Sequence, residues 1–248
     1  MSSQRSPVIT NVAKSRTQPS PFRFGPVEAP TLKDRISLNI RRAILQGHLP
    51  PGTRIVESAL AKEMNVAQTS VREGLMDSVN QGFLVKYVNR ETVVRKLDAH
   101  DIEGLFRVRI ELEGLAVELS HPNANEETLA PLYQLVDHMR EAGRSRQVAL
   151  FYESDIEFHR TLWRLSRNEF LERSLVPLSI SPVAFFLAGS PLPPIEHDFM
   201  RVAAEHGEIL DTFKKGSARA CRNLIVSKIK GWRDEQRQDV RWPHTKSG

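Results

Sequence analysis

The sequence contains only one cysteine, Cys221, which excludes a disulfide within the chain. Nowhere do about 18 apolar residues follow one another, so no membrane-spanning helix is expected. The first 20 residues also lack the apolar core of a secretory signal peptide. Hydrophobic residues at 40% are nevertheless sufficient for a core. These features predict a protein of the reducing cytoplasm whose fold depends on packing.

Positive charge is unevenly distributed, although the net charge of the chain is only +5. Residues 1–30 carry four Lys/Arg against one Asp/Glu, and residues 31–96 carry eleven against six. Residues 97–248 carry twenty against twenty-three. The excess positive charge therefore lies in the first 96 residues, which favours a nucleic-acid-binding front joined to a second domain. The alternative is two solvated surfaces with a chance imbalance.

Four segments follow from composition and periodicity. Residues 1–30 are rich in Ser, Pro, Arg and Thr without periodicity, and are predicted to be a disordered basic arm. Residues 31–96 and 97–238 have the patterns of folded domains, and residues 239–248 are expected to be a flexible tail.

Residues 31–96 have the pattern of three helices followed by a β-hairpin. Thr31 with Asp34 resembles a capping box at the start of a helix that Gly47 ends. The later elements are expected to be helices over 57–64 and 69–80, separated by a turn at 65–66, and strands over 83–88 and 92–95. This order predicts a winged helix-turn-helix, whose third helix reads the major groove of DNA.

The start of the third helix carries the residues suited to reading DNA. Ser70 and Glu73 have the spacing of a capping box, and Arg72 offers the planar fork that fits a guanine edge or a phosphate. The alternative is that Arg72 pairs with Glu73 or Asp77 on a solvated helix face. The predicted DNA-contacting residues are Arg42, Arg54, Gln68, Thr69, Ser70, Arg72, Asn89 and Arg90.

The front domain resembles the GntR family of bacterial regulators. The resemblance rests on Gly47, L-P-P-G-T-R-I at 49–55, T-S-V-R-E-G-L at 69–75, Gly82-Phe83-Leu84 and Asn89-Arg90. It implies a DNA-binding regulator.

The chain departs from the family pattern at several positions. Where the family has Ser-Arg, Pro, Ala and Gly, this chain has Ala67-Gln68, Ser70, Gly74 and Glu91. The missing arginine at position 68 removes a base contact, which affects the operator sequence but not DNA binding as such. Gly74 costs roughly 1 kcal/mol relative to alanine within a helix.

The rear domain has the pattern of an all-α bundle of six helices and shows no strand pattern. The helices are expected over about 98–120, 125–143, 148–166, 168–188, 196–215 and 217–238. The fold class is therefore mainly α, with an N-terminal winged helix-turn-helix and a C-terminal six-helix bundle.

Three side chains in the rear domain have the spacing of a metal site. Asp155 and His159 lie four residues apart on one predicted helix, and His206 lies on a later one. Two helices could thus hold Zn²⁺, Ni²⁺ or Mn²⁺ and leave coordination positions open. By spacing alone, the favoured alternative is two ordinary histidines on the surface or in the core.

The rear domain is also similar to the FCD effector domain of FadR-type GntR regulators. The similarity rests on R-x-x-x-E at 109–113, D-x-x-F-H at 155–159 and E-H-x-x-I-L at 205–210. It implies a cation held by an Asp and three His, with a small carboxylate effector completing its shell. The fourth ligand position falls at Lys228, which cannot ligate when protonated and would instead pair with Asp155 or an anionic effector.

Arg109 lies where family members often meet the effector carboxylate, and its alternative role is an ion pair with Glu113. The resemblance implies a homodimeric, cytoplasmic regulator, by default a repressor, and not an enzyme. It would bind a pseudo-palindromic operator and be switched by a small carboxylate. The alternatives are a metal-dependent enzyme using Asp155, His159 and His206, and a metal-free regulator that responds to an acyl thioester.

Overall fold

The computed structural model describes residues 31–87, 91–178 and 199–239. The predicted arm at 1–30, the hairpin tip with Asn89 and Arg90, and the tail from residue 240 lie outside the described residues. The second half of the helix predicted over 168–188 also lies outside them.

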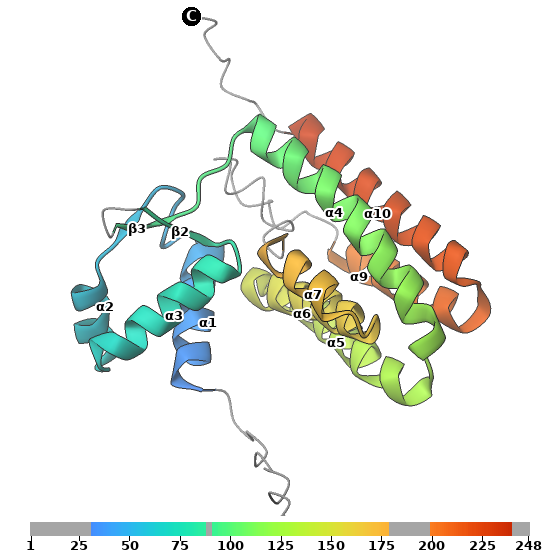
Figure 1. Cartoon of the computed structure of the whole chain (residues 1–248), viewed down its shortest axis with the longest axis horizontal. Helices are drawn as coiled ribbons and strands as arrows, with labels where there is room; N and C mark the ends of the chain where they lie inside the picture. Colours follow the sequence, from blue (N-terminus) through green and yellow to red (C-terminus); the bar gives the residue numbers. More distant parts are fainter. Residues whose placement is uncertain (1–30, 88–90, 179–198, 240–248) are drawn as a thin grey trace, which may run out of the picture. The chain divides into compact units, whose positions relative to one another are not determined.

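The front domain contains three helices and three short strands in its described part (Figure 1). They are α1 (Leu32–Leu45), β1 (Arg54–Ile55), α2 (Glu57–Met64), α3 (Gln68–Asn80), β2 (Leu84–Lys86) and β3 (Thr92–Val94). Strands β2 and β3 form the predicted hairpin, and β1 joins the far side of β3, so all three pair antiparallel in the order β1-β3-β2. The winged helix-turn-helix is therefore confirmed.

The starts of α1 and α3 are built differently. The Thr31 hydroxyl accepts a hydrogen bond from the Asp34 amide at 3.3 Å, and the Asp34 carboxylate accepts one from the Thr31 amide at 2.9 Å. This confirms the predicted capping box. The capping box predicted at Ser70 is wrong, because the N-cap of α3 lies three residues earlier and the helix begins at Gln68. Its N-cap residue is Ala67, which offers no capping side chain.

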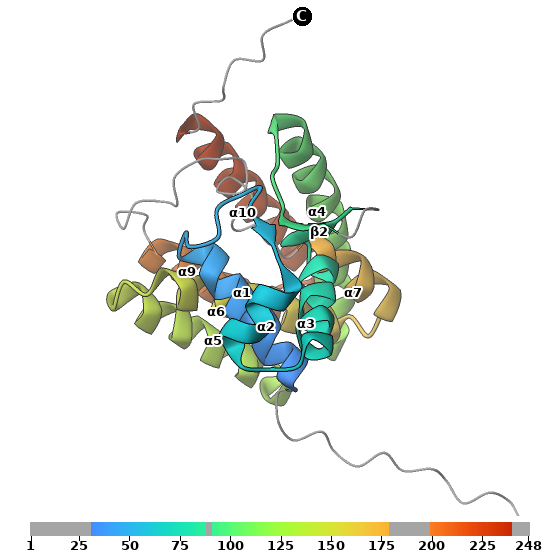
Figure 2. The same ribbon diagram turned by 90° about the vertical axis from the view of Figure 1, so that its left-hand side faces the viewer.

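Helices α1 and α3 pack directly against each other, as Figure 2 shows with α2 beside them. The turn between α2 and α3 is made by Asn65, which adopts the left-handed conformation at φ 52°. The buried apolar side chains that hold this domain together include Ile36, Ile40, Ile44, Ala61, Val71, Leu75, Phe83 and Leu84. This packing fixes the direction in which α3 presents its polar residues.

The rear domain is helical in all of its described elements. They are α4 (Ala99–Ser120), the 3-10 turn η1 (His121–Asn123), α5 (Glu126–Arg144), α6 (Val148–Leu165), α7 (Glu169–Leu175), α9 (Phe199–Lys215) and α10 (Ala218–Asp239). Asp98 and Asn125 cap α4 and α5 as expected. The long helix predicted over 168–188 is wrong, because α7 ends at Leu175 and a 3-10 turn follows. Pro177 explains this end, since its ring cannot donate to the helical hydrogen-bond ladder.

Helix α6 occupies a central place in the rear domain. It packs against α5 on one side and against α4 and α7 on others, while α9 packs on α5 and α10 runs along α4 (Figure 1). Its inward face carries Phe151, Ile156, Phe158 and Leu162, all of them buried. Polar residues on the same inward face are therefore enclosed by apolar neighbours. None of the helices within the described ranges is both long and apolar enough to span a membrane.

Candidate functional site

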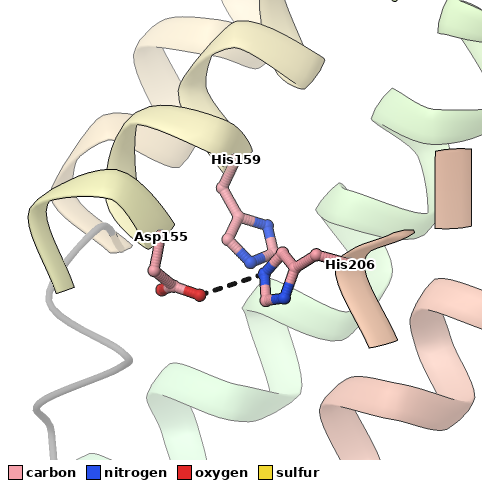
Figure 3. Close-up of side chains that lie close together, drawn as sticks. All are labelled: Asp155, His159 and His206. Carbon is pink, nitrogen blue, oxygen red and sulfur yellow. Dashed lines mark ion pairs between the residues drawn. The ribbon is translucent and has the colours of Figure 1, made fainter. Parts of the chain in front are cut away.

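The predicted metal-ligating residues come together inside the rear domain. Asp155 and His159 project from α6 toward His206 on α9 (Figure 3). One ligand atom from each of the three lies within 4.8 Å of the others. All three side chains are buried. The helical spacing of Asp155 and His159 placed them on one face, and the contact with His206 arises from packing between helices.

His206 is held by its main-chain neighbour. Its Nδ1 lies 2.7 Å from the carbonyl oxygen of Val202, to which it donates a hydrogen bond. Its Nε2 lies 3.0 Å from Oδ1 of Asp155. That contact has the distance of an ion pair but not the alignment of a hydrogen bond, so Nε2 has no hydrogen-bond partner within the described part of the chain. A buried ring nitrogen with this geometry suits a bound cation.

His159 is held by a side chain of another helix. Its Nδ1 lies 2.8 Å from Oε2 of Glu113 on α4, and its Nε2 lies 3.2 Å from a terminal nitrogen of Arg109. The other oxygen of Glu113 accepts a hydrogen bond from Nε of Arg109 at 2.5 Å. The predicted ion pair between Arg109 and Glu113 is therefore present. It is buried, however, and not on a solvated surface.

The charges in this cluster shift one another's proton affinities. Burial would raise the pKa of Glu113, but Arg109 and His159 outweigh it and lower that pKa to about 2. Burial likewise opposes ionisation of Asp155, yet the contact with His206 and the nearby cations lower its pKa. Burial would lower the pKa of His206, and the Asp155 carboxylate raises it instead. Both carboxylates are thus ionised, and a cation would compete with a proton for Nε2 of His206.

The three residues line a pocket whose empty space, with its open mouth included, is about 580 Å³. Arg109 and Lys228 line the same pocket. Most of its remaining wall is apolar, formed by Phe151, Tyr152, Ile209, Ile225, Ile229 and Trp232. A few polar groups within an apolar wall are typical of a small-molecule site.

Lys228 does not pair with Asp155, so that expectation is wrong. Its Nζ lies 2.7 Å from Oε2 of Glu208 and 3.7 Å from Oε1 of Glu205. Both glutamates lie on α9, where the side chain of Glu205 is 20% exposed and that of Glu208 is 58% exposed. The lysine charge is therefore balanced by carboxylates other than Asp155.

The residues present fit a divalent cation. Two imidazoles and a carboxylate are ligands that Zn²⁺, Ni²⁺ and Mn²⁺ accept. Each histidine has its Nδ1 occupied by an outer partner, which leaves Nε2 to face the cluster. One obstacle is the guanidinium of Arg109 at Nε2 of His159, which a cation would have to displace.

On the front domain, the beginning of α3 presents the predicted DNA-contacting residues. Gln68, Thr69 and Arg72 are exposed and Ser70 is half-buried. Arg72 pairs with neither Glu73 nor Asp77. Instead its Nε and a terminal nitrogen lie 3.1 and 3.0 Å from one oxygen of Glu57 on α2. This contact holds the arginine at the surface, with its side chain still 57% exposed.

The other predicted DNA contacts have different surroundings. Arg42 forms a two-pronged ion pair with Glu153 on α6, at 2.6 and 2.9 Å. Arg54 pairs with Glu91 at 3.2 Å and remains exposed. Binding of DNA by Arg42 would require its pair with Glu153 to open. The sequence motifs did not indicate that partner.

Gly74 in α3 lies where α1 approaches most closely. A Cβ atom at this position would lie 2.5 Å from Cγ2 and 2.7 Å from Cβ of Ile36. The cost assigned to Gly74 from helix propensity alone is therefore incomplete, since its small size permits the packing of α1 on α3.

Sequence reasoning named Glu113 only as the partner of Arg109. Its second contact, with His159, joins residues 46 positions apart on different helices. The R-x-x-x-E motif placed Arg109 and Glu113 on one helix face, but it contained no signal for the histidine.

Comparison with known proteins matches both parts of the chain to domain families. Residues 104–230 match the FCD domain, and residues 32–94 match the bacterial regulatory proteins of the gntR family. The two matches correspond to the helical domain and the winged helix-turn-helix.

Relatives identified by sequence are transcriptional regulators. The chain is 33% identical over 132 residues to the Nta operon transcriptional regulator of Aminobacter aminovorans, covering 53% of this chain and 62% of that one. It is 26% identical over 188 residues to a D-xylose utilization operon transcriptional repressor of Paenarthrobacter nicotinovorans, covering 75% and 80%. These names are those of regulators, and the alternative of a metal-dependent enzyme is set aside.

Solved structures share the fold. McbR/YncC of E. coli aligns with a TM-score of 0.67 at 20% identity, covering 84% of this chain and 98% of that one. A GntR regulator from Rhodococcus sp. RHA1 aligns with the same TM-score and identity over 84% and 99%. From its two matched domains and its fold, the chain belongs to the GntR family of bacterial transcriptional regulators and carries an FCD effector domain.

Proposed function

We propose that this regulator is a homodimeric repressor that a small carboxylate releases from DNA, with a divalent metal ion in the helical domain. Two winged domains would read the half-sites of a pseudo-palindromic operator, because a two-fold dimer requires two-fold DNA symmetry. Repression is supported by relatives that are named as repressors. Since its target is bacterial DNA, the protein would act in the cytoplasm.

The observation that carries the proposal is the set of three inward-facing ligand atoms on Asp155, His159 and His206. They are buried and belong to two helices, and one of them has no hydrogen-bond partner. A bound ion would supply positive charge and open coordination positions for a carboxylate. Three protein ligands leave at least one such position in a tetrahedral or larger shell.

The pocket walls indicate the kind of effector. Arg109 reaches the metal ligands from α4 and could grip a carboxylate with its terminal nitrogens. The aromatic and aliphatic residues of the same wall would suit an apolar body. Lys228, held by two glutamates of α9, would meet a second anionic or polar group on the effector. We therefore propose a small acid with an apolar portion.

On DNA, Arg72 is the proposed reader of a base edge, with Gln68, Thr69 and Ser70 beside it at the start of α3. Support comes from the exposure of Gln68, Thr69 and Arg72, and from Glu57, which holds Arg72 at the surface. Arg42, Arg54, Asn89 and Arg90 are proposed to contact the DNA backbone or minor groove. An effector would release the protein only if it favours one arrangement of the two heads over another.

The experiment that tests the metal site measures metal content by mass spectrometry. Untagged protein, never exposed to chelator or a nickel column, is compared with His159→Ala. About one metal per chain in the wild type, lost in the variant, is the expected result. His138→Ala, which changes an exposed histidine on α5, should keep its metal.

Absence of metal in the wild type, even after addition of Zn²⁺, Mn²⁺ or Ni²⁺, would contradict the metal site. The effector search would then turn to metal-independent anions and acyl thioesters. Displacement of a fluorescent acyl analogue would identify the thioester class.

A further inference from the structure

Glu113 is a completely buried carboxylate at the back of the proposed metal site. An ionised carboxylate is costly to bury unless each oxygen is satisfied. Here one oxygen accepts from Nε of Arg109, one turn earlier on α4, and the other accepts from Nδ1 of His159 on α6. The same side chain therefore determines how two pocket residues are oriented.

We propose that Glu113 is the positioning residue of the site. It selects the His159 tautomer whose Nε2 lone pair faces Asp155 and His206, and it holds Arg109 beside that lone pair. This inference rests on the proposed function, in which the three residues bind a divalent cation.

The tautomer follows from hydrogen-bond chemistry. An ionised carboxylate only accepts hydrogen bonds, so the proton of His159 lies on Nδ1, facing Glu113. Nε2 then carries a lone pair, which agrees with the N–H group of Arg109 at 3.2 Å. His206 reaches the same tautomer through the carbonyl of Val202. The carbonyl of Val202 belongs to the main chain, so a side-chain substitution cannot remove it. Of the two Nδ1 partners, only Glu113 can be removed in this way.

The bond from Glu113 to Arg109 has a second consequence. The lone pair on Nε2 of His159 accepts a hydrogen bond from a terminal nitrogen of Arg109. A cation bound by the three ligands would need that lone pair and would therefore displace the hydrogen bond. Arg109 remains anchored through its Nε while that terminal nitrogen is released toward the pocket. Metal binding would thus free an N–H group of Arg109 for the effector, while the hydrogen bond between Nε of Arg109 and Glu113 remains.

The test is Glu113→Gln, which keeps the size of the side chain but replaces one acceptor by an NH₂ donor. The amide oxygen can serve Arg109 or His159, but not both. If it serves Arg109, the NH₂ group faces Nδ1 of His159 and favours the other tautomer, with the proton on Nε2. We expect the affinity for Zn²⁺ to fall 10- to 100-fold, as for other outer partners of metal-bound histidines.

The direct readout is ¹⁵N NMR of the histidine rings in chelator-treated protein. The wild type should show His159 protonated at Nδ1, and Glu113→Gln should shift the proton toward Nε2. Glu111→Gln, which changes a largely exposed glutamate on the same helix, should leave both the tautomer and the Zn²⁺ affinity unchanged.

A rescue experiment separates positioning from simple destabilisation. In the double variant Arg109→Met/Glu113→Gln, the amide oxygen no longer has to serve an arginine and can accept from Nδ1 of His159. Zn²⁺ affinity and the Nδ1–H tautomer should then return. A variant that binds poorly only because its core is damaged would not be repaired by a second core substitution.

Two outcomes would overturn the inference. One is a wild-type His159 protonated at Nε2, which requires no variant to fold. The other is a Glu113→Gln protein with wild-type tautomer and wild-type Zn²⁺ affinity. If the wild type binds no metal, the proposed function fails, while the tautomer measurements still decide the role of Glu113.

Discussion

Two arginine–glutamate pairs, one in each domain, differ in what surrounds them. Arg72 and Glu57 meet on the front domain, where the arginine side chain is 57% exposed. Arg109 and Glu113 meet inside the rear domain, with side chains 6% and 0% exposed. The same type of ion pair is therefore exposed in one domain and buried in the other.

The difference lies in solvation. Water screens the surface pair, which contributes little to stability and can open or rearrange when a phosphate or base arrives. The buried pair cannot exchange its partners for water, so losing one leaves an uncompensated charge. Arg72, which we propose to contact DNA, is held loosely at the surface, whereas the residues of the proposed enclosed site are held by mutual contacts.

The largest effect on DNA binding is expected from Arg72→Ala. Removal of a bidentate arginine contact weakens specific binding by about 1–3 kcal/mol, or roughly 5- to 150-fold. The measurement is fluorescence anisotropy at physiological salt on an operator selected from random DNA by the wild-type protein. Arg173→Ala, which removes an exposed arginine of α7, provides the control. An unchanged affinity would mean that Arg72 does not contact the operator, and its proposed difference in role from Arg109 would be wrong.

The buried pair should instead appear in the pH dependence of stability. The pKa of Glu113 is about 2 in the folded protein, against 4.5 for the free side chain. Its stabilising contribution is present above pH 4.5 and is lost as the pH falls toward 2, amounting to about 3 kcal/mol. Urea unfolding of chelator-treated protein from pH 6 to pH 2 measures this loss, which Glu113→Gln should reduce.

An exposed carboxylate provides the matched comparison. The pKa of Asp34 is also lowered, by its hydrogen bonds with Thr31, but the side chain lies at the surface of the front domain. Asp34→Asn should leave the acid limb of the stability curve nearly as steep as in the wild type. If Asp34→Asn and Glu113→Gln changed the pH dependence of the unfolding free energy equally, burial would not explain the difference between the two carboxylates.

Two glycine substitutions are expected to have opposite signs. Gly74→Ala places a methyl group against Ile36, and overpacking of this kind costs about 1–3 kcal/mol, more than the roughly 1 kcal/mol gained in helix propensity. Gly104→Ala in α4 meets nothing within 4 Å and should stabilise by about 0.5–1 kcal/mol. Thermal or urea unfolding reports both changes. Stabilisation by Gly74→Ala would mean that α1 can move away from α3 at little cost.

The smallest effect concerns the helix starts of the front domain. Thr31→Ala removes the cap of α1 and should destabilise by about 1 kcal/mol. Ser70→Ala should change the free energy of unfolding by less than about 0.5 kcal/mol, because Ser70 does not cap α3. Chemical denaturation measures both values, and a larger effect at Ser70 would restore the capping box that the sequence suggested.

Local patterns predicted most of the fold. The caps of α1, α4 and α5 and the bounds of α2 agree with the sequence, because they depend on residues within one turn of each other. The errors at Ser70 and Pro177 are also local. At Ser70, the helix has its N-cap three residues earlier than predicted; at Pro177, the prediction overlooked the proline.

The site was predicted less completely. Asp155 and His159 share a helix face, so their proximity followed from spacing. The partner of Lys228 could not be predicted from spacing. Glu205 and Glu208 on α9 pair with the lysine in place of Asp155, and the packing of the helices decides which carboxylate is nearer. The partners of Arg72 and Arg42, on α2 and α6, were missed for the same reason.

By itself, the sequence determined the two domains, their helices, the family and the residue types available for metal and DNA. The tertiary structure alone decided that His206 meets Asp155, that Glu113 bridges Arg109 and His159, and that Gly74 admits Ile36. The reason is physical. Helical periodicity relates residues up to about four positions apart, whereas these contacts join different helices, whose relative placement results from packing of the whole core.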